Sequence, residues 1–360
     1  RTSRAAEPVQ FGVLTLGDWM AGPDGDDRPT RAERFARIVR LAERAEALGF
    51  DAFHVGEHHL CEYIVSSPQL LLAAISQRTE RIRLSTGVTL VANRDPVHLA
   101  EDYASLDLLS NGRAELIAGR GNAFFDAYLQ FGQQLEDSRE RFGEHLELLL
   151  RLWREEAVSF EGAYRAPLCE VGLEPRPQQA GGPTVWLGGG SSTDSADMAA
   201  RLGLPLQLPG VFAGAGAFAG LAEHYRHAWN AASHGDAPRV GFTAHCFVGE
   251  DGAAARNYWA PWHLGYQRWV WELICAQSGH EGPPPIADRK AAFEDPDRSP
   301  GLCGDPDEVA ARIVAWHRVL GGIDRMVIKF DGGNLPEDVV HGSLELFARE
   351  VVPRVRAVIA

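Results

Sequence analysis

Short apolar runs alternate with longer amphipathic segments along most of the chain. The runs are rich in β-branched and aliphatic residues, which is typical of strands. They lie at residues 10–17, 51–57, 82–90, 113–121, 184–190, 204–210, 239–249 and 324–330. The segments between them place apolar side chains at helical spacing, as at Phe35, Ile38, Leu41 and Ala45, and Gly49 follows as a helix terminator. The alternation predicts eight β/α units.

Eight such units in 360 residues, with no break in composition, predict a single domain over residues 1–360. The expected fold is α/β, a (β/α)8 TIM barrel with insertions. A doubly wound open sheet is the alternative, but the chain lacks the glycine fingerprint after its first strand. A Gly- and Pro-rich insertion is expected at about 156–182. The long polar segment 276–304, before the last β/α unit, is expected to form a lid-like loop.

Charge and composition narrow the classes of partner. The net charge of −14 disfavours nucleic acid and anionic membranes. No window reaches the roughly 18 apolar residues of a membrane span, and the first residues contain no apolar signal segment. The five cysteines are odd in number and contain no C-x-x-C pair, which argues against a disulfide framework or structural zinc. A cytoplasmic protein is expected.

In a barrel, function lies where strands end and the following loops begin. After the strand at 184–190, the sequence GGGSSTDS places Ser191, Ser192 and Ser195 at the start of a helix. Such a start can bind phosphate through free N–H groups and the helix dipole, although an ordinary serine N-cap has the same pattern. Arg120, between two glycines, and Arg139, at the next helix start, could reach the same phosphate. Surface ion pairs are the alternative for them.

Three other places on this rim could contact a ligand. Gly87 lies within a strand, which indicates close approach of a ligand or simply barrel packing. Trp19 follows the first strand. Trp259 and Trp262 belong to a helical stripe with Tyr266 and Trp269. Such a stripe is more often core, but beside the expected lid it could wall an apolar substrate pocket.

The sequence EHH, residues 57–59, ends the second strand. Three ionisable side chains in a row are costly to bury without partners, so a metal site, a catalytic site and a solvated turn all come into question. A metal site needs further ligands, and His54, His98 and His245 have no diagnostic spacing. We therefore expect no metal.

The sequence resembles the bacterial luciferase-like (LLM) family of flavin-dependent monooxygenases over nearly its whole length. Five motifs in the family's order carry the resemblance. They are LGFDAFHVGEHH, ANRDPVHLAEDYASLDLLSNGR, GRGNAFFDAYLQFG with EDSRERFGEHLELLLRLW, PTVWLGGGSSTDSADMAARLGLP, and SLELFAREVVPRV.

The resemblance implies a reaction. The cofactor would be FMN, used as FMNH2 and supplied by a separate flavin reductase. Together with O2 it would oxygenate a small apolar organic substrate through a C4a-peroxyflavin. The substrate would be an aldehyde, ketone, alkene or aromatic natural-product intermediate. Family members are usually dimers, so a homodimer is expected.

The resemblance also assigns roles to residues. His58 matches the catalytic histidine beside the flavin, expected to act as acid or base with a pKa near working pH. Residues matching cofactor contacts are Glu57, Gly87, Val88, Arg120, Arg139, Gly190, Ser191, Ser192 and Ser195, with a cis peptide at Gly87–Val88. His59, Trp19, Trp259 and Trp262 are expected at the substrate pocket. Gly119 and Ser191 replace a cysteine and a glutamate of luciferase, so light emission is not implied.

Three alternatives remain. Some relatives of this fold use a deazaflavin for hydride transfer, and the EHH motif favours the monooxygenase branch only modestly. The chain could also be a non-catalytic flavin-binding partner subunit, against which the retention of His58 and both arginines argues. A metal-dependent barrel hydrolase is the third alternative.

Overall fold

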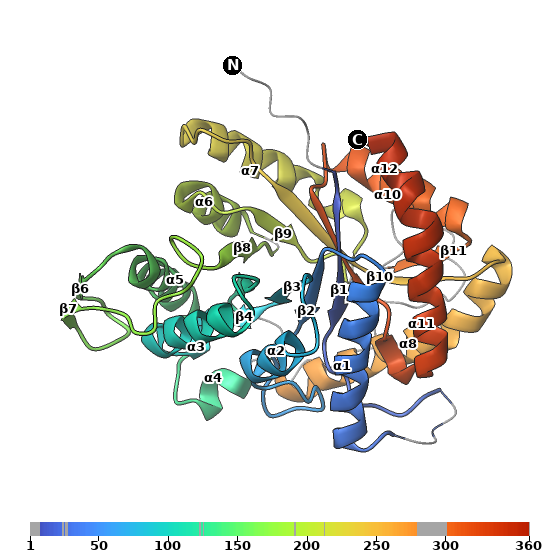
Figure 1. The fold of residues 1–360 in the computed structure, drawn as a ribbon, viewed down its shortest axis with the longest axis horizontal. Coiled ribbons are helices and arrows are strands. Elements are labelled where there is room, and N and C mark those ends of the chain that lie inside the picture. The colour runs from blue at the N-terminus through green and yellow to red at the C-terminus, as the bar shows by residue number, and fades with distance from the viewer. Residues whose placement is uncertain are drawn as a thin grey trace.

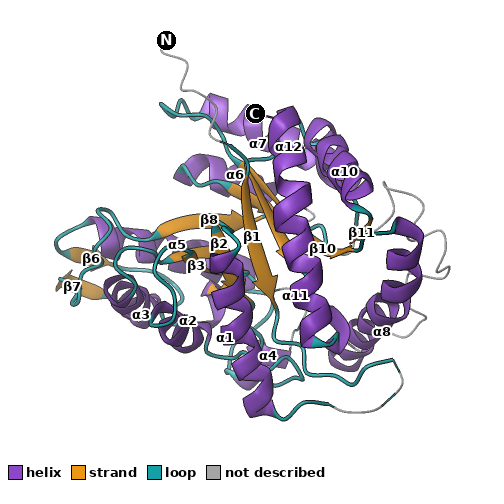
Figure 2. Ribbon diagram, turned by 45° about the vertical axis from the view of Figure 1, so that its right-hand side comes forward, coloured by secondary structure: helices purple, strands orange, loops and turns teal. Residues whose placement is uncertain are grey.

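The computed structural model describes residues 8–23, 25, 28–121, 124, 126–190, 192–211, 213–278 and 301–359. A parallel sheet occupies the centre, and helices surround it (Figure 1). Figure 2, turned by 45°, shows α1, α11 and α12 in front of the strands and α8 at the side.

Eight strands follow one another around a barrel. They are β1 (Gln10–Thr15), β2 (Ala52–Val55), β3 (Arg83–Thr86), β5 (Glu115–Gly119), β8 (Thr184–Gly188), β9 (Leu206–Leu208), β10 (Val240–Val248) and β12 (Arg325–Lys329). Neighbours pair in parallel, and β12 returns beside β1. A parallel bridge between Leu84 and Ala114 links β3 to the segment before β5. The predicted TIM barrel and its eight strands are confirmed.

The helices begin and end where local chemistry favours it. They are α1 (Arg31–Ala47), α2 (Pro68–Ser76), α3 (Pro96–Leu109), α5 (Ser138–Arg154), α6 (Thr193–Leu202), α7 (Ala219–Ala231), α8 (Gly252–Ser278), α10 (Pro306–Val319), α11 (Glu337–Leu346) and α12 (Val352–Ile359), with a π-helical turn at Phe347–Val351. Capping boxes start α1 at Thr30 and α10 at Asp305, satisfying N–H groups that lack partners within the helix. Gly203, in the left-handed region, ends α6.

Some elements were not expected. The insertion at 156–182 contains a hairpin, β6 (Val158–Phe160) with β7 (Leu168–Val171). A short helix α4 (Asp126–Gln130) and a two-residue strand β4 (Thr89–Leu90) flank the barrel rim. The last residues of the predicted lid form β11 (Gly301–Gly304), which pairs with β10, because Leu302 and Cys303 are buried. Residues 279–300 of that lid lie outside the described residues.

A buried polar layer closes the amino-terminal end of the barrel. Nη1 of Arg325 lies 2.7 Å from Oε2 of Glu115, and Arg83 pairs with the same carboxylate. The Arg325 guanidinium also lies over the Trp186 ring, 4.5 Å from its centroid. Although burial alone would raise it, the Arg325 and Arg83 charges lower the pKa of Glu115 to about 2. The carboxylate therefore stays charged, as a paired buried group can.

Candidate active site

A cavity of about 370 Å³ lies at the carboxyl-terminal ends of the barrel strands. This volume falls within the range of small-molecule sites, roughly 300–1,000 Å³. Its walls come from nearly every barrel strand and from the loops that follow them, together with one face of α8. Of the predicted site residues, those that line it are Glu57, His58, His59, Gly87, Val88, Arg120, Arg139, Gly190, Ser192 and Ser195.

One end of the cavity, which we call the phosphate end, gathers Arg120, Arg139 and the start of α6. Oγ of Ser195 donates to the Ser192 carbonyl oxygen at 3.1 Å, and the Gly190 N–H donates to that hydroxyl at 3.4 Å. These bonds hold the glycine-serine turn against the helix start. Ser191, the remaining predicted residue of this turn, lies outside the described residues.

The two arginines at this end have different partners. Nη1 of Arg120 donates to Oγ of Ser138 at 3.0 Å. Arg139 forms an ion pair with Asp194, in the first turn of α6, and both side chains are about half exposed. Asp194 was not singled out from the sequence, although a carboxylate inside a predicted phosphate loop is a signal that could have been noticed.

The other end, the ring end, is built from close backbone contacts. The peptide bond between Gly87 and Val88 is cis, as the resemblance implied. A Cβ placed on Gly119 would lie only 2.3 Å from Cγ2 of Val88. The side chain of Val88 therefore occupies the space that a side chain at Gly119 would need. This contact leaves no room for a larger residue than glycine at position 119.

Glu57 joins the end of β2 to the segment after this cis peptide. Its fully buried carboxylate accepts a hydrogen bond from the Leu90 N–H at 2.9 Å through Oε2. Its Oε1 lies 3.0 Å from Nε2 of His59. Glu57 thus positions both His59 and the backbone that lines the cavity, and each of its two buried oxygens has a partner.

His58 presents its ring to the cavity between aromatic neighbours. The ring stacks on Tyr63 with centroids 4.1 Å apart and meets Phe124 edge-on at 5.1 Å. Burial, with smaller contributions from His59 and Lys329, lowers the pKa of His58 to about 3. The expectation of a pKa near working pH is therefore wrong for this structure. Nδ1 is buried without a hydrogen-bond partner among the described residues, and at this pKa the imidazole is neutral.

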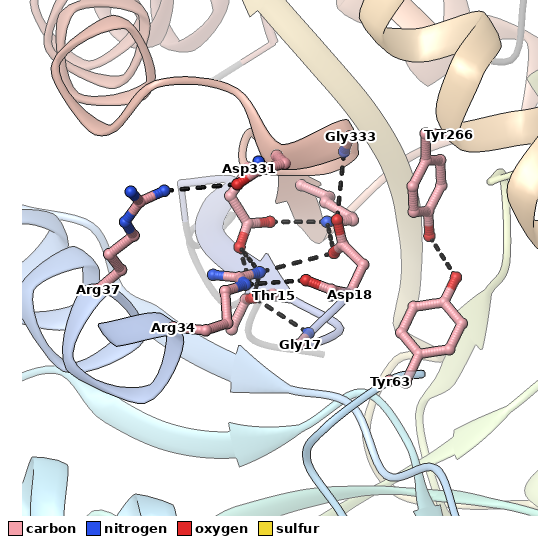
Figure 3. Close-up of polar contacts among 11 residues, drawn as sticks. Thr15, Gly17, Asp18, Arg34, Arg37, Tyr63, Tyr266, Asp331 and Gly333 are labelled. Carbon is pink, nitrogen blue, oxygen red and sulfur yellow. Dashed lines mark hydrogen bonds and ion pairs between the residues drawn. The ribbon is translucent and has the colours of Figure 1, made fainter. Parts of the chain in front are cut away.

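Two tyrosines line the cavity beside His58. The hydroxyl oxygens of Tyr63 and Tyr266 lie 2.8 Å apart, as Figure 3 shows. Burial raises the pKa of each phenol well above its usual value, so both stay protonated. Sequence reasoning placed Tyr266 in a stripe and missed Tyr63, which carries no local signal.

A charged cluster lies next to this tyrosine pair and outside the cavity lining (Figure 3). Nζ of Lys329 lies 2.6 Å from Oδ1 of Asp18 and 2.7 Å from Oδ1 of Asp331, and Nη2 of Arg34 lies 2.7 Å from Oδ2 of Asp331. Although burial opposes it, the Lys329 and Arg34 charges lower the pKa of Asp331 below its usual range. The cluster fastens β1, α1 and β12 together under the rim.

The three tryptophans predicted at the pocket do not line the cavity formed by the described residues. Trp19 stacks under the Arg31 guanidinium, 3.9 Å from its ring centroid, and Trp259 is buried against Phe247. Trp262 packs against Gly22. Helix α8 instead presents residues four apart, Tyr266, Val270 and Ile274. Trp259 and Trp262 lie about two turns and one turn before Tyr266 along α8, so they differ from the lining residues in position along the helix.

Two further findings concern the described residues only. No group of three or more His, Cys, Asp or Glu side chains is arranged there to hold a metal ion. No helix in that part of the chain combines the length and apolar character that crossing a membrane requires.

Comparison with known proteins identifies the family to which the chain belongs. The sequence profile of luciferase-like monooxygenases matches residues 9–322, and the chain belongs to this family. It is therefore an oxidoreductase of the monooxygenase type, and homologues of the family are flavin-dependent monooxygenases.

Three relatives illustrate this placement. A 4-hydroxyprotoasukamycin monooxygenase of Streptomyces nodosus subsp. asukaensis is 29% identical over 88% of this chain and 86% of its own. The oxygenase component of a flavin-dependent trigonelline monooxygenase from Acinetobacter baylyi is 24% identical over 91% of both chains. The crystal structure of monooxygenase RslO1 from Streptomyces bottropensis superposes with a TM-score of 0.81, at 28% identity over 96% of this chain and 99% of that one. Some other matching proteins are F420-dependent by name.

Proposed function

We propose that this protein is the oxygenase component of a two-component monooxygenase. It takes FMNH2 from a separate flavin reductase and uses O2 to oxygenate a small apolar organic substrate. The observation that carries the proposal is the shape of one cavity. Arg120, Arg139 and the α6 start converge at one end, and a neutral His58 with aromatic neighbours lies at the other.

The phosphate end suits the terminal phosphate of FMN. Two guanidinium groups, the hydroxyls of Ser192 and Ser195 and the α6 N-terminus offer charge and donors to a dianion. A Cβ added at Gly190 would meet nothing within 4 Å, so the backbone there is open to a ligand. We include Ser191 in this site because it lies between Gly190 and Ser192 in the chain.

The ring end suits a flat isoalloxazine. Gly87, Val88, Gly119 and Gly188 line it with backbone rather than long side chains. Bound reduced flavin would supply the electrons that activate O2 at its C4a atom. The rings of Tyr63 and Phe124 pack against His58, which limits water around the reacting atoms. Burial is the main cause that holds the pKa of His58 at about 3, so His58 would accept or return the proton that this chemistry moves only when a bound ligand gives its ring a hydrogen-bond partner.

The remaining walls indicate the kind of substrate. Phe124, Val270 and Ile274 give an apolar surface, and the Tyr63–Tyr266 pair adds hydroxyls. This lining suits an aldehyde, ketone, alkene or aromatic compound. The similarity to 4-hydroxyprotoasukamycin monooxygenase supports a role in natural-product biosynthesis.

Partners and assembly complete the proposal. The similarity to a protein named as an oxygenase component supports a separate reductase. Leu70 of α2 and Leu108 and Leu109 of α3 are exposed by 74%, 47% and 57%. An apolar patch of this kind on adjacent helices fits a homodimer interface. The five unpaired cysteines fit a cytoplasmic location.

Titration of the flavin-free protein tests the central claim. Separate titrations with FMN, FMNH2 and coenzyme F420, followed by flavin fluorescence or absorbance, distinguish the two cofactor classes. We expect binding of FMN and FMNH2. Binding of F420 alone would make the protein a deazaflavin-dependent oxidoreductase, and binding of none would remove the proposal.

A further inference from the structure

One side chain at the phosphate end has the wrong charge for a phosphate site. Asp194 lines the cavity, in the same turn of α6 whose N–H groups and neighbouring hydroxyls would receive the dianion. A carboxylate near an anion site weakens anion binding by charge repulsion. The position of Asp194 therefore needs an explanation.

The carboxylate of Asp194 uses the contacts that a phosphate would use. It forms an ion pair with Arg139, and Oγ of Ser192 donates to its Oδ2 at 3.4 Å. It also lies in the first turn of α6, where the helix dipole favours negative charge. Three features that attract a phosphate thus already attract this carboxylate.

The ion pair between Arg139 and Asp194 can separate readily. The side chains of Arg139 and Asp194 are 50% and 54% exposed, so either can swing into solvent without uncovering the core. Exposed pairs of this kind are weak, and a phosphate with up to two charges and three acceptor oxygens is a stronger partner for a guanidinium. Asp194 can therefore hold Arg139 in the cavity wall and still give way to a phosphate.

We propose that Asp194 is a competitor built into the phosphate site. It pairs with Arg139 when the site holds no flavin, and the flavin phosphate must displace it. Its charge then remains near the phosphate and opposes binding. The inference rests on the proposed function, and it sets the flavin as an exchangeable substrate, bound and released in each cycle, rather than a resident group.

The test compares Asp194→Asn with a matched variant, Asp197→Asn. Both residues lie on α6, and both side chains are 54% exposed. Each substitution removes one negative charge. Asp197 pairs with His224 at 2.7 Å and does not line the cavity. The flavin-free full-length proteins are titrated with FMN and with riboflavin, which lacks the phosphate, and the dissociation constants are compared. Thermal melting of each variant checks that it is folded.

We expect Asp194→Asn to bind FMN about three- to tenfold more tightly than the wild type, as the loss of a competing exposed pair allows. Riboflavin binding should not change, and Asp197→Asn should bind both ligands within about twofold of the wild type. Unchanged or weaker FMN binding by Asp194→Asn would overturn the inference, because Asp194 would then support the phosphate contacts. An equal gain in Asp197→Asn would overturn it too. Failure of all three proteins to bind FMN would overturn the proposed function itself.

Discussion

The two ends of the cavity recognise a ligand by different physical means. The phosphate end is polar, half-exposed and made of side chains that can move, such as Arg139 and Asp194. The ring end is buried and made of fixed backbone, with Val88 against Gly119 and His58 against Tyr63. The first should set affinity through charge, and the second should set reactivity and shape. Substitutions at each end can separate these roles.

The largest effect is expected at the ring end, from His58→Ala. Loss of a positioned acid–base group lowers rates by about 10²- to 10⁴-fold. We expect a loss of that size in oxygenated product from whichever substrate the wild type accepts, while FMN binding stays within a few-fold. The ratio of product to hydrogen peroxide measures it. His98→Ala, on the exposed side of α3, is the control. Undiminished product formation with FMN bound would refute the catalytic role.

Arg120→Ala should have the next largest effect, at the phosphate end. Losing a charge-assisted hydrogen bond should weaken FMN binding about 10- to 100-fold. Riboflavin binding should hardly change, because the contact is to the phosphate. Parallel fluorescence titrations of both ligands measure the contrast. Arg31→Ala, which removes a guanidinium from the Trp19 ring instead, should alter neither. Equal weakening of both ligands would show that Arg120 acts on the fold rather than on the phosphate.

Gly119→Ala tests the fixed backbone of the ring end. The added Cβ would overlap Val88, and overpacking of this kind costs about 1–3 kcal/mol. We expect a lower melting temperature and weaker binding of FMN and riboflavin alike. Adding Val88→Gly should restore part of the stability, because it removes the atoms in conflict. If Gly119→Ala is as stable as the wild type, the Val88 side chain or its backbone can move aside, and this part of the cavity is not rigid.

The pH dependence of stability should show the burial of His58. Its pKa falls from 6.5 to about 3 on folding, so the unfolded chain binds a proton that the folded chain does not. The contribution of His58 to the free energy of unfolding is then fully present above about pH 6.5, and it is lost as the pH falls toward 3. His58→Ala should reduce that slope by at most about 1.4 kcal/mol per pH unit. Urea unfolding between pH 4 and 6.5 measures it, and an unchanged slope would contradict a neutral buried ring.

Regular patterns along the chain predicted the barrel well. Strand β10 and helix α5 fall where apolar runs and helical spacing placed them, because both signals are local. The sequence also predicted that Arg120, Arg139 and the serines at the start of α6 would lie together, because all of them follow strand ends, and their binding of a phosphate stays a prediction. Strand β11 was missed because a glycine-flanked Leu-Cys pair has no periodicity, and only pairing with β10 makes it a strand.

The ring end was less predictable for a physical reason. The Tyr63–Tyr266 bond joins residues 203 apart in the sequence. The reason for glycine at position 119 lies in Val88, on another element. The low pKa of His58 depends on how closely the surrounding walls pack, which no single stretch encodes. The resemblance to a family predicted which residues meet there, but not how they are held.

The Glu115–Arg325 layer has a consequence for the order of events. It closes the barrel at the amino-terminal end, so in the described part of the chain exchange with solvent takes place at the opposite end. In the proposed reaction, a substrate lying over the flavin ring would then obstruct the departure of the flavin. The flavin should therefore bind before the substrate, and the product should leave before the oxidised flavin.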